Sequence, residues 1–215
     1  MKVLIACEES QAITIEMRKL WIEAYSCDIL DCSWWHPEWH IKWDAIKEAY
    51  SWKYDMMIAH PPCTYLSVAW AWAMYNKDWS IKQERMDNQN EAAEFFMKLM
   101  NAPIDKIAIE NPICVMSTRF RKPNQIIHPY HFWDEASKST CLWTKNLPLL
   151  EYTNIVWKWE FKEWVDKKTW KTKRQAQWIY DALGKWWKKR HIQKLRSKTF
   201  PGIAKAIANQ YWLLN

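Results

Sequence analysis

Short apolar runs alternate with amphipathic stretches along the first half of the chain. Residues 2–7, KVLIAC, form a β-branched apolar run of the kind found in buried strands, and residues 12–21, AITIEMRKLW, follow with helical periodicity. By the same patterns we predict further strands at 23–29, 54–59 and 106–112 and a helix at 88–100. Strands that alternate with helices across short turns are typical of a parallel α/β sheet.

The alternation stops near residue 150, where a basic segment begins. Of the chain's 31 Lys and Arg, 14 lie between residues 158 and 198, against four of its 24 Asp and Glu. A block of this kind indicates a polyanionic partner, most often nucleic acid, although a solvated lysine-rich face is the alternative. A last amphipathic helix is predicted at 203–212. We therefore expect an α/β core (1–143), a small basic segment (144–195) and a C-terminal helix that returns to the core (196–215).

Residues able to do chemistry follow directly after the predicted strands. The strand ends carry CEES, CDI, HPPC and ENP, and in parallel sheets ligands collect at the carboxyl ends of the strands. Cys63 comes after two prolines, which fix two backbone φ angles and remove two hydrogen-bond donors, so the strand must stop there. This arrangement predicts a thiol presented on a stiff loop.

Composition indicates an ordinary globular protein. The chain has 215 residues, 49% of them hydrophobic and 26% charged, which is enough to bury a core of normal size. It contains no apolar run near 18 residues and no charged-then-apolar leader, so we expect no membrane span and a cytoplasmic location. The six cysteines include no CxxC pair, and in a reducing cytosol we expect thiols rather than disulfides.

Tryptophan is abundant and glycine is nearly absent. The chain has 19 Trp and two Gly, whereas average usage gives about 15 glycines. Many tryptophans stand where turns and helix ends favour glycine, as in LWIEA, SWWHPE and GKWWKK. One hypothesis is that UGA codons specifying glycine in a variant code have been translated as Trp. The alternative is a chain that carries Trp at its turns, and ordinary UGG codons at Trp21, Trp43 and Trp70 would exclude the hypothesis.

Two of the strand ends carry motifs of a known family. Residues 59–70, AHPPCTYLSVAW, match the Pro-Pro-Cys, the Ser and the Ala of Gly-Gly-Pro-Pro-Cys-Gln-x-Phe-Ser-x-Ala-Gly, with Trp70 at the last glycine. IENP at 109–112 matches Glu-Asn-Val, and KWDAI at 42–46 matches Gly-Asp with Trp in place of glycine. Over about its first 115 residues and its closing helix, the chain resembles the cytosine-5 DNA methyltransferases, particularly the short members carried by phages and prophages.

The resemblance implies a fold and a set of site residues. The fold is a Rossmann-like class I methyltransferase sheet that binds S-adenosyl-L-methionine, and the basic segment serves target recognition on double-stranded DNA whose cytosine is flipped out. Cys63 is the nucleophile that adds to carbon 6 of cytosine, Glu110 hydrogen-bonds or protonates ring N3, and Asn111 braces the loop. The implied cofactor contacts are Ala6, Cys7, Glu8, Asp28, Ile29, Asp44, Ala45 and Pro62. The implied substrate contacts are Pro61, Ser67, Lys138, Lys188, Lys189, Arg190 and Arg196.

The chain departs from the family at two points. Its first loop, ACEES, lacks the glycine-rich Phe-x-Gly-x-Gly-Gly, and it has no Gln-x-Arg-x-Arg motif, for which Lys138 in SKSTCLW is the nearest counterpart. Two alternatives therefore stay open: a catalytically silent DNA-binding relative, and an enzyme that acts on free cytosine nucleotides. Methylation of an exocyclic amine is disfavoured, because such enzymes conventionally have an aromatic residue at the Cys63 position. We expect a monomer.

A possible metal cluster overlaps the predicted cofactor strand. Cys27, Cys32, His36 and His40 form C-x4-C-x3-H-x3-H, and all four are ligand types that zinc accepts. The spacing is not that of a standard zinc finger, and Cys27 belongs to the strand that would carry the cofactor. We therefore assign no metal site.

Overall fold

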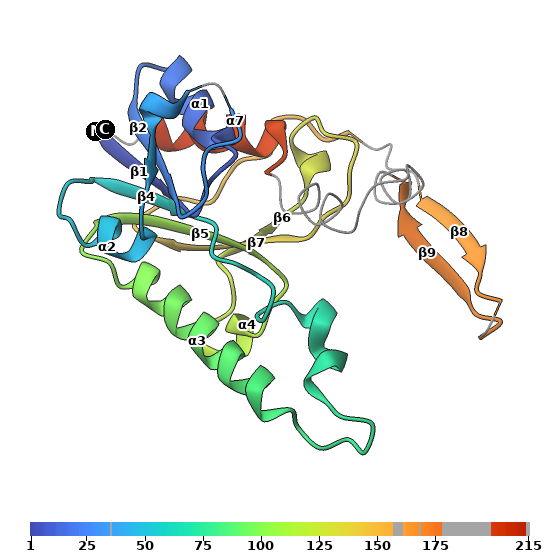
Figure 1. The fold of residues 1–215 in the computed structure, drawn as a ribbon. Coiled ribbons are helices and arrows are strands. Elements are labelled where there is room, and N and C mark those ends of the chain that lie inside the picture. The colour runs from blue at the N-terminus through green and yellow to red at the C-terminus, as the bar shows by residue number, and fades with distance from the viewer. Residues whose placement is uncertain (35, 157–160, 168, 178–198, 214–215) are drawn as a thin grey trace.

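The computed structural model describes residues 1–34, 36–156, 161–167, 169–177 and 199–213. Within these ranges the chain forms a seven-stranded sheet and a separate two-stranded sheet (Figure 1). The large sheet contains β1 (Lys2–Ala6), β2 (Glu23–Asp28), β3 (His40–Lys42), β4 (Met56–Ala59), β5 (Lys106–Pro112), β6 (Gln125–Ile127) and β7 (Thr140–Lys145). Its strand order is β3-β2-β1-β4-β5-β7-β6.

Five neighbouring strands of this sheet are parallel. The pairs β1–β2, β1–β4, β2–β3 and β4–β5 are parallel, whereas β7 is antiparallel to both β5 and β6. The order β3-β2-β1-β4-β5 is that of a doubly wound, Rossmann-like sheet, with β7 added between β5 and β6. The predicted α/β fold with a mostly parallel sheet is confirmed, and the antiparallel pairs of β7 are an addition to it.

Helices cover both faces of the large sheet (Figure 1). The helices α1 (Ala12–Lys19) and α7 (Pro201–Trp212) pack on one face, and α2 (Ala45–Ala49) and α3 (Gln83–Met100) pack on the other. Alternate residues of β1 serve the two layers, since Val3 and Ile5 pack toward α1 and α7, and Leu4 toward α2 and α3. A parallel sheet buried on both faces requires such continuous apolar strands.

The remaining helical elements are short. They are α4 (Met116–Arg119) and the 3-10 helices η1 (Pro37–Trp39), η2 (Val68–Met74) and η3 (Pro129–His131). No helix in the described part of the chain is both long enough and apolar enough to cross a membrane.

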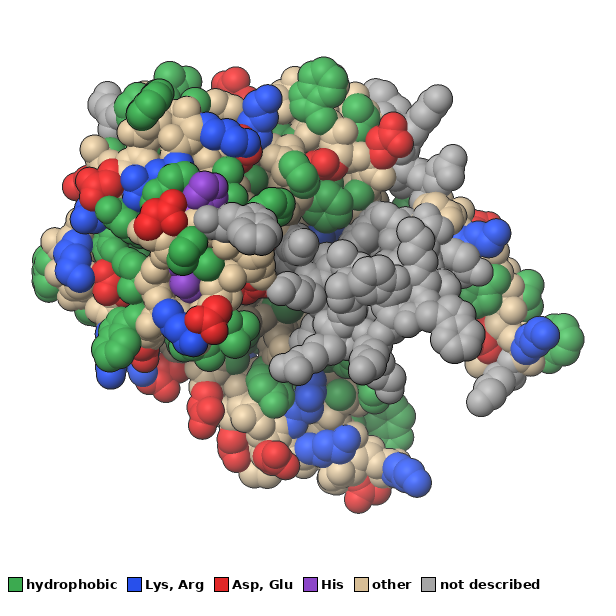
Figure 2. Space-filling model, turned by 45° about the horizontal axis from the view of Figure 1, so that its top comes forward, with side chains coloured by type: hydrophobic (Ala, Val, Ile, Leu, Met, Phe, Trp, Pro, Cys, Tyr) green, Lys and Arg blue, Asp and Glu red, His purple; other side chains and the backbone are tan. Residues whose placement is uncertain are grey.

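Within the basic segment, β8 (Phe161–Val165) and β9 (Thr172–Ala176) form an antiparallel hairpin. The guanidinium carbon of Arg174 lies 3.9 Å from the centroid of the Phe161 ring, and its Nε lies 3.4 Å from the carboxylate of Glu163. Lys173 forms an ion pair with Asp166. Figure 2 shows Lys and Arg side chains at the surface of this hairpin, beside hydrophobic ones. The boundaries at 144 and 195 stay a prediction.

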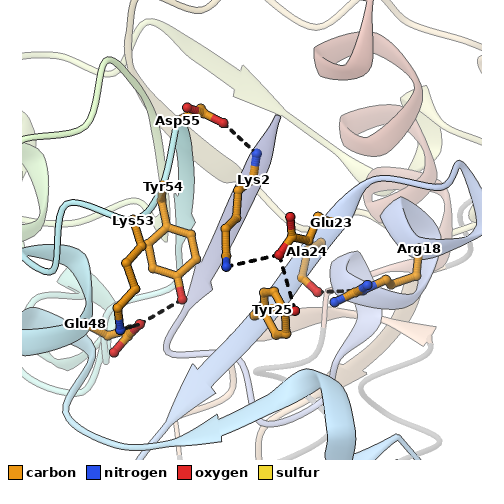
Figure 3. A network of polar contacts seen from close by, with 9 residues as sticks. All are labelled: Lys2, Arg18, Glu23, Ala24, Tyr25, Glu48, Lys53, Tyr54 and Asp55. Atoms are coloured by element: carbon orange, nitrogen blue, oxygen red, sulfur yellow. Dashed lines mark hydrogen bonds and ion pairs between the residues drawn. The ribbon is translucent and has the colours of Figure 1, made fainter.

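A polar network joins the amino-terminal ends of three strands (Figure 3). The Lys2 ammonium lies 3.0 Å from the carboxylate of Glu23, and the Lys2 backbone N–H donates to Asp55 at 2.6 Å, which links the starts of β1, β2 and β4. Nearby, the Tyr54 hydroxyl donates to Glu48 at 2.8 Å. These contacts lie at the opposite edge from the chemistry-bearing strand ends, so we assign them to stability.

Among the residues that the structure describes, five tryptophans adopt a left-handed backbone conformation. Trp21, Trp52, Trp79, Trp133 and Trp170 have φ angles between 55° and 75°. Between 67% and 96% of each residue is exposed, so none of them fills the core. A bulky residue at positive φ is a rare outlier, whereas glycine adopts this conformation readily.

Two other tryptophans are packed against specific partners. Trp143 is fully buried, its Nε1 donates to the carbonyl of Arg121 at 2.8 Å, and its ring meets Phe96 edge-on. Trp39 stacks on His36 with ring centroids 4.0 Å apart. These two residues have the contacts expected of genuine tryptophans.

Gly202 allows α7 to start in close contact with the backbone near η3. A Cβ atom at this position would lie 1.7 Å from the carbonyl oxygen of Phe132, a distance that no side chain permits. The Gly202 N–H also donates to the carboxylate of Asp134 at 2.8 Å. This glycine is therefore required for the docking of α7.

Candidate active site at the carboxyl edge of the sheet

The carboxyl ends of the parallel strands bring together residues from distant parts of the chain. Ala59 of β4 pairs with Ala6 of β1 and with Ile109 of β5, so His60 and Glu110, which follow, lie at one level of the sheet. The N–H of His60 also donates to the carbonyl of Ala6 at 2.9 Å. The chain leaves β1 and β4 toward opposite sides of the sheet, which is the switch point where such folds bind ligands.

The Cys63 loop is fixed to both neighbouring strand ends. The side-chain amide of Asn111, at the end of β5, donates to the carbonyl of Pro61 at 2.8 Å. The Cys63 carbonyl accepts the N–H of Ser67 at 2.9 Å, which closes a turn, and Ser67 then pairs with Cys114 beyond β5. The Asn111 contact is the one that bracing of the loop requires. Cys63 itself is half-buried.

Burial makes four other thiols poor nucleophiles. Desolvation is the main cause that raises the pKa of Cys27 to about 12, that of Cys114 to about 11 and that of Cys141 to about 12. Desolvation and the charge of Asp28 raise the pKa of Cys7 further still. Because the thiolate is the nucleophilic form, these four cysteines stay inert at neutral pH.

Glu110 is held by two basic side chains. His60 Nδ1 lies 3.1 Å from Glu110 Oε2, and only 11% and 15% of these two side chains are exposed. Burial favours the neutral carboxyl, but the hydrogen bond from His60 and the positive charges of Lys138 and His60 outweigh it, so the pKa of Glu110 lies below its usual range. A small cavity beside the pair is also lined by Thr140 and Phe200. Glu110 is therefore ionised at neutral pH.

Glu8 faces the interior at the start of α1. Its Oε1 accepts the N–H of Ile13 at 2.7 Å, its Oε2 accepts the hydroxyl of Thr14 at 2.7 Å, and only 3% of the residue is exposed. Burial raises its pKa, while the charge of His60 and the bonds from α1 oppose that rise. The carboxylate thus serves the first turn of α1, and its predicted contact with the cofactor stays a prediction.

The first loop has a glycine-like backbone without glycine. Cys7 and Gln11 have φ angles of 59° and 52°. The N–H groups of Cys7 and Glu8 both donate to the carbonyl of Cys27, at 2.7 and 3.3 Å, so the loop closes tightly over the end of β2. The left-handed positions correspond to what a glycine-rich phosphate or nucleoside loop supplies.

Three of the predicted cofactor residues present groups that suit a nucleoside. Asp28, at the end of β2, accepts the N–H of Leu30 through Oδ1 at 2.9 Å, and Ile29 beside it is 74% exposed. Asp44 caps α2 through Oδ1, 2.8 Å from the N–H of Ile46. An acid about 20 residues after the first turn takes the ribose hydroxyls in Rossmann-like sites, and Asp28 lies at that spacing.

The other predicted cofactor residues contribute differently. Ala6 is fully buried and its carbonyl accepts the N–H of His60, and Ala45 is only 6% exposed, so neither presents a side chain to a ligand at this edge. Pro62 is exposed on the Cys63 loop. Residues present at the edge therefore fit the adenosine part of the predicted cofactor, through Asp28, Ile29 and Asp44.

A cleft opens beside the Cys63 loop. Its volume is about 220 Å³, and its lining includes Ser67, Tyr65 and Arg85. The guanidinium carbon of Arg85 lies 5.2 Å from the centroid of the Tyr65 ring, and Gln89 donates to the Tyr65 carbonyl at 3.0 Å. Sequence reasoning missed Tyr65, Arg85 and His60 as site residues, since no motif marks them and Arg85 meets Tyr65 only through the packing of α3.

The predicted substrate contacts fall into two groups. Pro61 and Ser67 lie on the Cys63 loop, and Lys138 precedes β7 with its ammonium 6.0 Å from the centroid of the Phe200 ring. The other four, Lys188, Lys189, Arg190 and Arg196, lie outside the described residues.

The four side chains of the possible zinc cluster have other partners. Both ring nitrogens of His40 are engaged, with Ser26 Oγ at 2.8 Å and the Leu30 carbonyl at 2.9 Å. His36 pairs with Glu38, and the thiols of Cys27 and Cys32 donate to backbone carbonyls. Among the residues that the structure describes, no group of three or more His, Cys, Asp or Glu side chains is arranged to hold a metal ion.

Comparison with known proteins does not identify a function for this site. Comparison with protein-family models gives no match for the chain, and no curated protein matches it. The site residues and their contacts therefore carry the proposal of function.

Proposed function

We propose that the protein is a DNA methyltransferase that transfers a methyl group from S-adenosyl-L-methionine to carbon 5 of cytosine. The observation that carries this proposal is the Pro-Pro-Cys63 loop, which Asn111 ties to the strand end that bears Glu110. A thiol on a stiff loop beside a buried carboxylate supplies the nucleophile and the acid–base group that the reaction needs. The resemblance of both motifs to those of cytosine-5 methyltransferases supports the same assignment.

Cys63 would start and end the reaction on the ring. Its thiolate adds to carbon 6, and the electron pair of the C5–C6 double bond then makes carbon 5 nucleophilic. When bound, S-adenosylmethionine would supply the methyl group. A water molecule would then take the C5 proton, and the electron pair left behind would restore the C5–C6 double bond as Cys63 leaves as a thiolate. The cysteine is therefore regenerated in each turnover.

Glu110 and the loop would orient the cytosine. The carboxylate of Glu110 suits the N3 and 4-amino edge of the ring, and the hydrogen bond from Asn111 keeps the Cys63 loop in register with it. Because carbon 6 is inaccessible inside a stacked duplex, the target base must be flipped out. Asp28, Ile29 and Asp44 would hold the adenosine of the cofactor at the neighbouring strand ends.

The basic segment supports DNA as the polymer that carries the cytosine. The described hairpin presents Lys162, Lys171, Lys173 and Arg174, and further basic residues continue to Lys198. Such a concentration of positive charge binds phosphates independently of sequence. The segment would clamp the duplex while the sheet edge performs the chemistry.

Nucleoside analysis tests the proposal. The protein is incubated with methyl-labelled S-adenosylmethionine and mixed DNA, and the DNA is digested to nucleosides. We expect labelled 5-methylcytosine with the wild-type protein. Cys63→Ser should give no label, because its oxygen is a far weaker nucleophile at neutral pH, but it should still bind DNA. Label only in free nucleotides, or DNA binding without any transfer, would reject the proposal in favour of a nucleotide enzyme or a silent relative.

A trapping experiment tests the covalent step directly. In DNA that contains 5-fluorocytosine, fluorine cannot leave carbon 5 as the proton does, so the adduct with the thiolate accumulates after methyl transfer. We expect a protein–DNA adduct that survives denaturation, absent from Cys63→Ser and present in the matched variant Cys32→Ser. An adduct that persists in Cys63→Ser would assign the nucleophile elsewhere.

A further inference from the structure

His60 lies directly behind Glu110, on the strand end that also leads to Cys63. Its Nδ1 is 3.1 Å from Glu110 Oε2, while its Nε2 is buried and has no hydrogen-bond partner among the described residues. The side chains are only 11% and 15% exposed, so bulk water has little access to the pair. The hydrogen bond to Glu110 therefore sets the orientation of the imidazole.

Groups from three other elements face this pair. Glu8, after β1, is buried, which raises its pKa, and the positive charge of His60 lowers it. Lys138, before β7, adds a positive charge that lowers the pKa of Glu110 against the effect of burial. Phe200, the residue directly before α7, lines the cavity beside the pair. Two carboxyls and one ammonium thus surround the imidazole in a largely apolar setting.

An ionised Glu110 has no proton of its own to give. Addition of the Cys63 thiolate brings a negative charge into the ring, and a proton at N3 is needed to neutralise it. Burial raises the pKa of Glu110, but the hydrogen bond from His60 and the charges of Lys138 and His60 lower it below its usual value. A proton donor in contact with Glu110 would meet this need, and His60 Nδ1 lies 3.1 Å from Glu110 Oε2.

We propose that His60 is a positioning residue that holds the proton which Glu110 passes to N3 of the cytosine. This inference rests on the function proposed above. In the proposed step the imidazolium form of His60 gives its Nδ1 proton to the Glu110 carboxylate, and Glu110 passes a proton to N3 as the sulfur–C6 bond forms. The imidazolium becomes imidazole, Glu110 ends as a carboxylate, and the negative charge of the thiolate is neutralised. The proton returns to His60 by the same path when the adduct collapses.

The substitution His60→Asn separates proton transfer from hydrogen bonding. The amide of Asn places an N–H near the position of Nδ1, so it still donates to Glu110, but it has no proton to release. We expect kcat to fall by about 10² to 10⁴-fold, with the KM for S-adenosylmethionine and the melting temperature close to wild type. Glu110→Gln should lose a similar factor. The double variant should be no slower than the slower single variant, because both residues act in one step.

A matched control exists at the surface. His36 Nδ1 also lies 3.1 Å from a glutamate, Glu38, but this pair is exposed and outside the site. The variant His36→Asn should leave both kcat and the melting temperature unchanged. If His60→Asn keeps kcat within about threefold of wild type, with the same pH–rate profile, the inference is overturned.

A measurement without substrate distinguishes this inference from the proposed function. Carbon-13 NMR follows the Glu110 carboxyl through a pH titration in wild type, His60→Asn and His60→Leu. The pKa of Glu110 should rise in both variants, and more in His60→Leu, which also loses the hydrogen bond. An unchanged titration would refute the coupling even in an active enzyme. A shifted titration in a protein that methylates no cytosine would instead reject the methyltransferase function.

Discussion

At the scale of single residues, the tryptophans divide by backbone conformation. Five exposed ones lie at positive φ, where an L side chain is strained, while Trp39 and Trp143 have stacked or buried partners. Turn and motif context in the sequence marks Trp21 as a glycine position, but it also marks Trp43 and Trp70, which are not among the residues at positive φ. The conformations support the hypothesis that glycine belongs at the five positions.

Replacing these five tryptophans with glycine should stabilise the protein. A bulky residue in the left-handed region costs about 1 to 3 kcal/mol, which glycine avoids. We expect each of Trp21→Gly, Trp52→Gly, Trp79→Gly, Trp133→Gly and Trp170→Gly to raise the melting temperature, measured by circular dichroism. Trp143→Gly is the control and should unfold the protein, because it empties a fully buried site. Lower melting temperatures in the five variants would show that the tryptophans are genuine.

Two histidines near η3 should make the fold sensitive to acid. Burial lowers the pKa of His128, and burial together with the charge of His128 lowers the pKa of His131. Below about pH 6.5 the unfolded chain therefore binds more protons than the folded one, and stability is lost as the pH falls. We expect the melting temperature to drop between about pH 7 and pH 5, and less so in His128→Gln. Equal drops in both proteins would contradict this assignment.

His60 shows why residue-scale prediction has a limit. Pro-Pro-Cys63 and Glu110-Asn111 are recognisable because each motif is contiguous in the sequence. The pairing of His60 with Glu110 spans 50 residues and depends on the register of β4 against β5, which a single sequence does not encode locally. Glu8 is a similar case, because its bonds to α1 depend on how the first loop closes.

At the scale of elements, the Cys63 loop depends on one buried amide. Asn111 is 1% exposed. In the described part of the chain, its side-chain amide links β5 to the Cys63 loop by donating to the Pro61 carbonyl. β5 itself was predictable, since KIAIENP has an apolar run that ends at a proline. The strands β3 and β6 were not, because three residues are too few to show a period.

Asn111→Ala should loosen the loop and weaken the fold. The Pro61 carbonyl would lose its partner, which costs about 1 to 3 kcal/mol of unfolding free energy when the group is buried. We expect that loss in urea denaturation, together with faster alkylation of Cys63 in the native state. Asn209→Ala is the matched control, since its amide donates to the Lys205 carbonyl at 2.9 Å on an exposed helix face. If Cys63 in native Asn111→Ala were alkylated at the wild-type rate, Asn111 would not brace the loop.

At the scale of the whole molecule, the excess of basic residues and the candidate active site lie in different parts of the chain. The strand ends of the core carry the candidate site, while the basic surplus lies between residues 158 and 198. The α/β sheet was predictable from its apolar periodicity. The hairpin of β8 and β9 was not, because its lysine-rich strands show little apolar alternation.

Neutralising part of the basic segment should flatten the salt dependence of DNA binding. Each lost phosphate contact lowers the slope of log K against log salt by about 1. We expect a lower slope, with cofactor affinity unchanged, when glutamines replace Lys185, Lys188, Lys189 and Arg190. The control replaces four exposed lysines of the core, Lys19, Lys53, Lys98 and Lys205, and should leave the slope near wild type. Equal slopes in both sets would place DNA elsewhere on the protein.

The contact between β1 and α7 has a consequence for how the protein is made. Val3 and Ile5 of β1 belong to the same buried apolar cluster as Ile203 and Ile207 of α7. During translation this apolar face of β1 therefore stays without its α7 partners until residues 201–212 have left the ribosome. Such late closure slows folding and leaves a nascent chain open to aggregation. We expect the native fold of the core to form only after α7 has emerged from the ribosome, with chaperones shielding β1 in the interval.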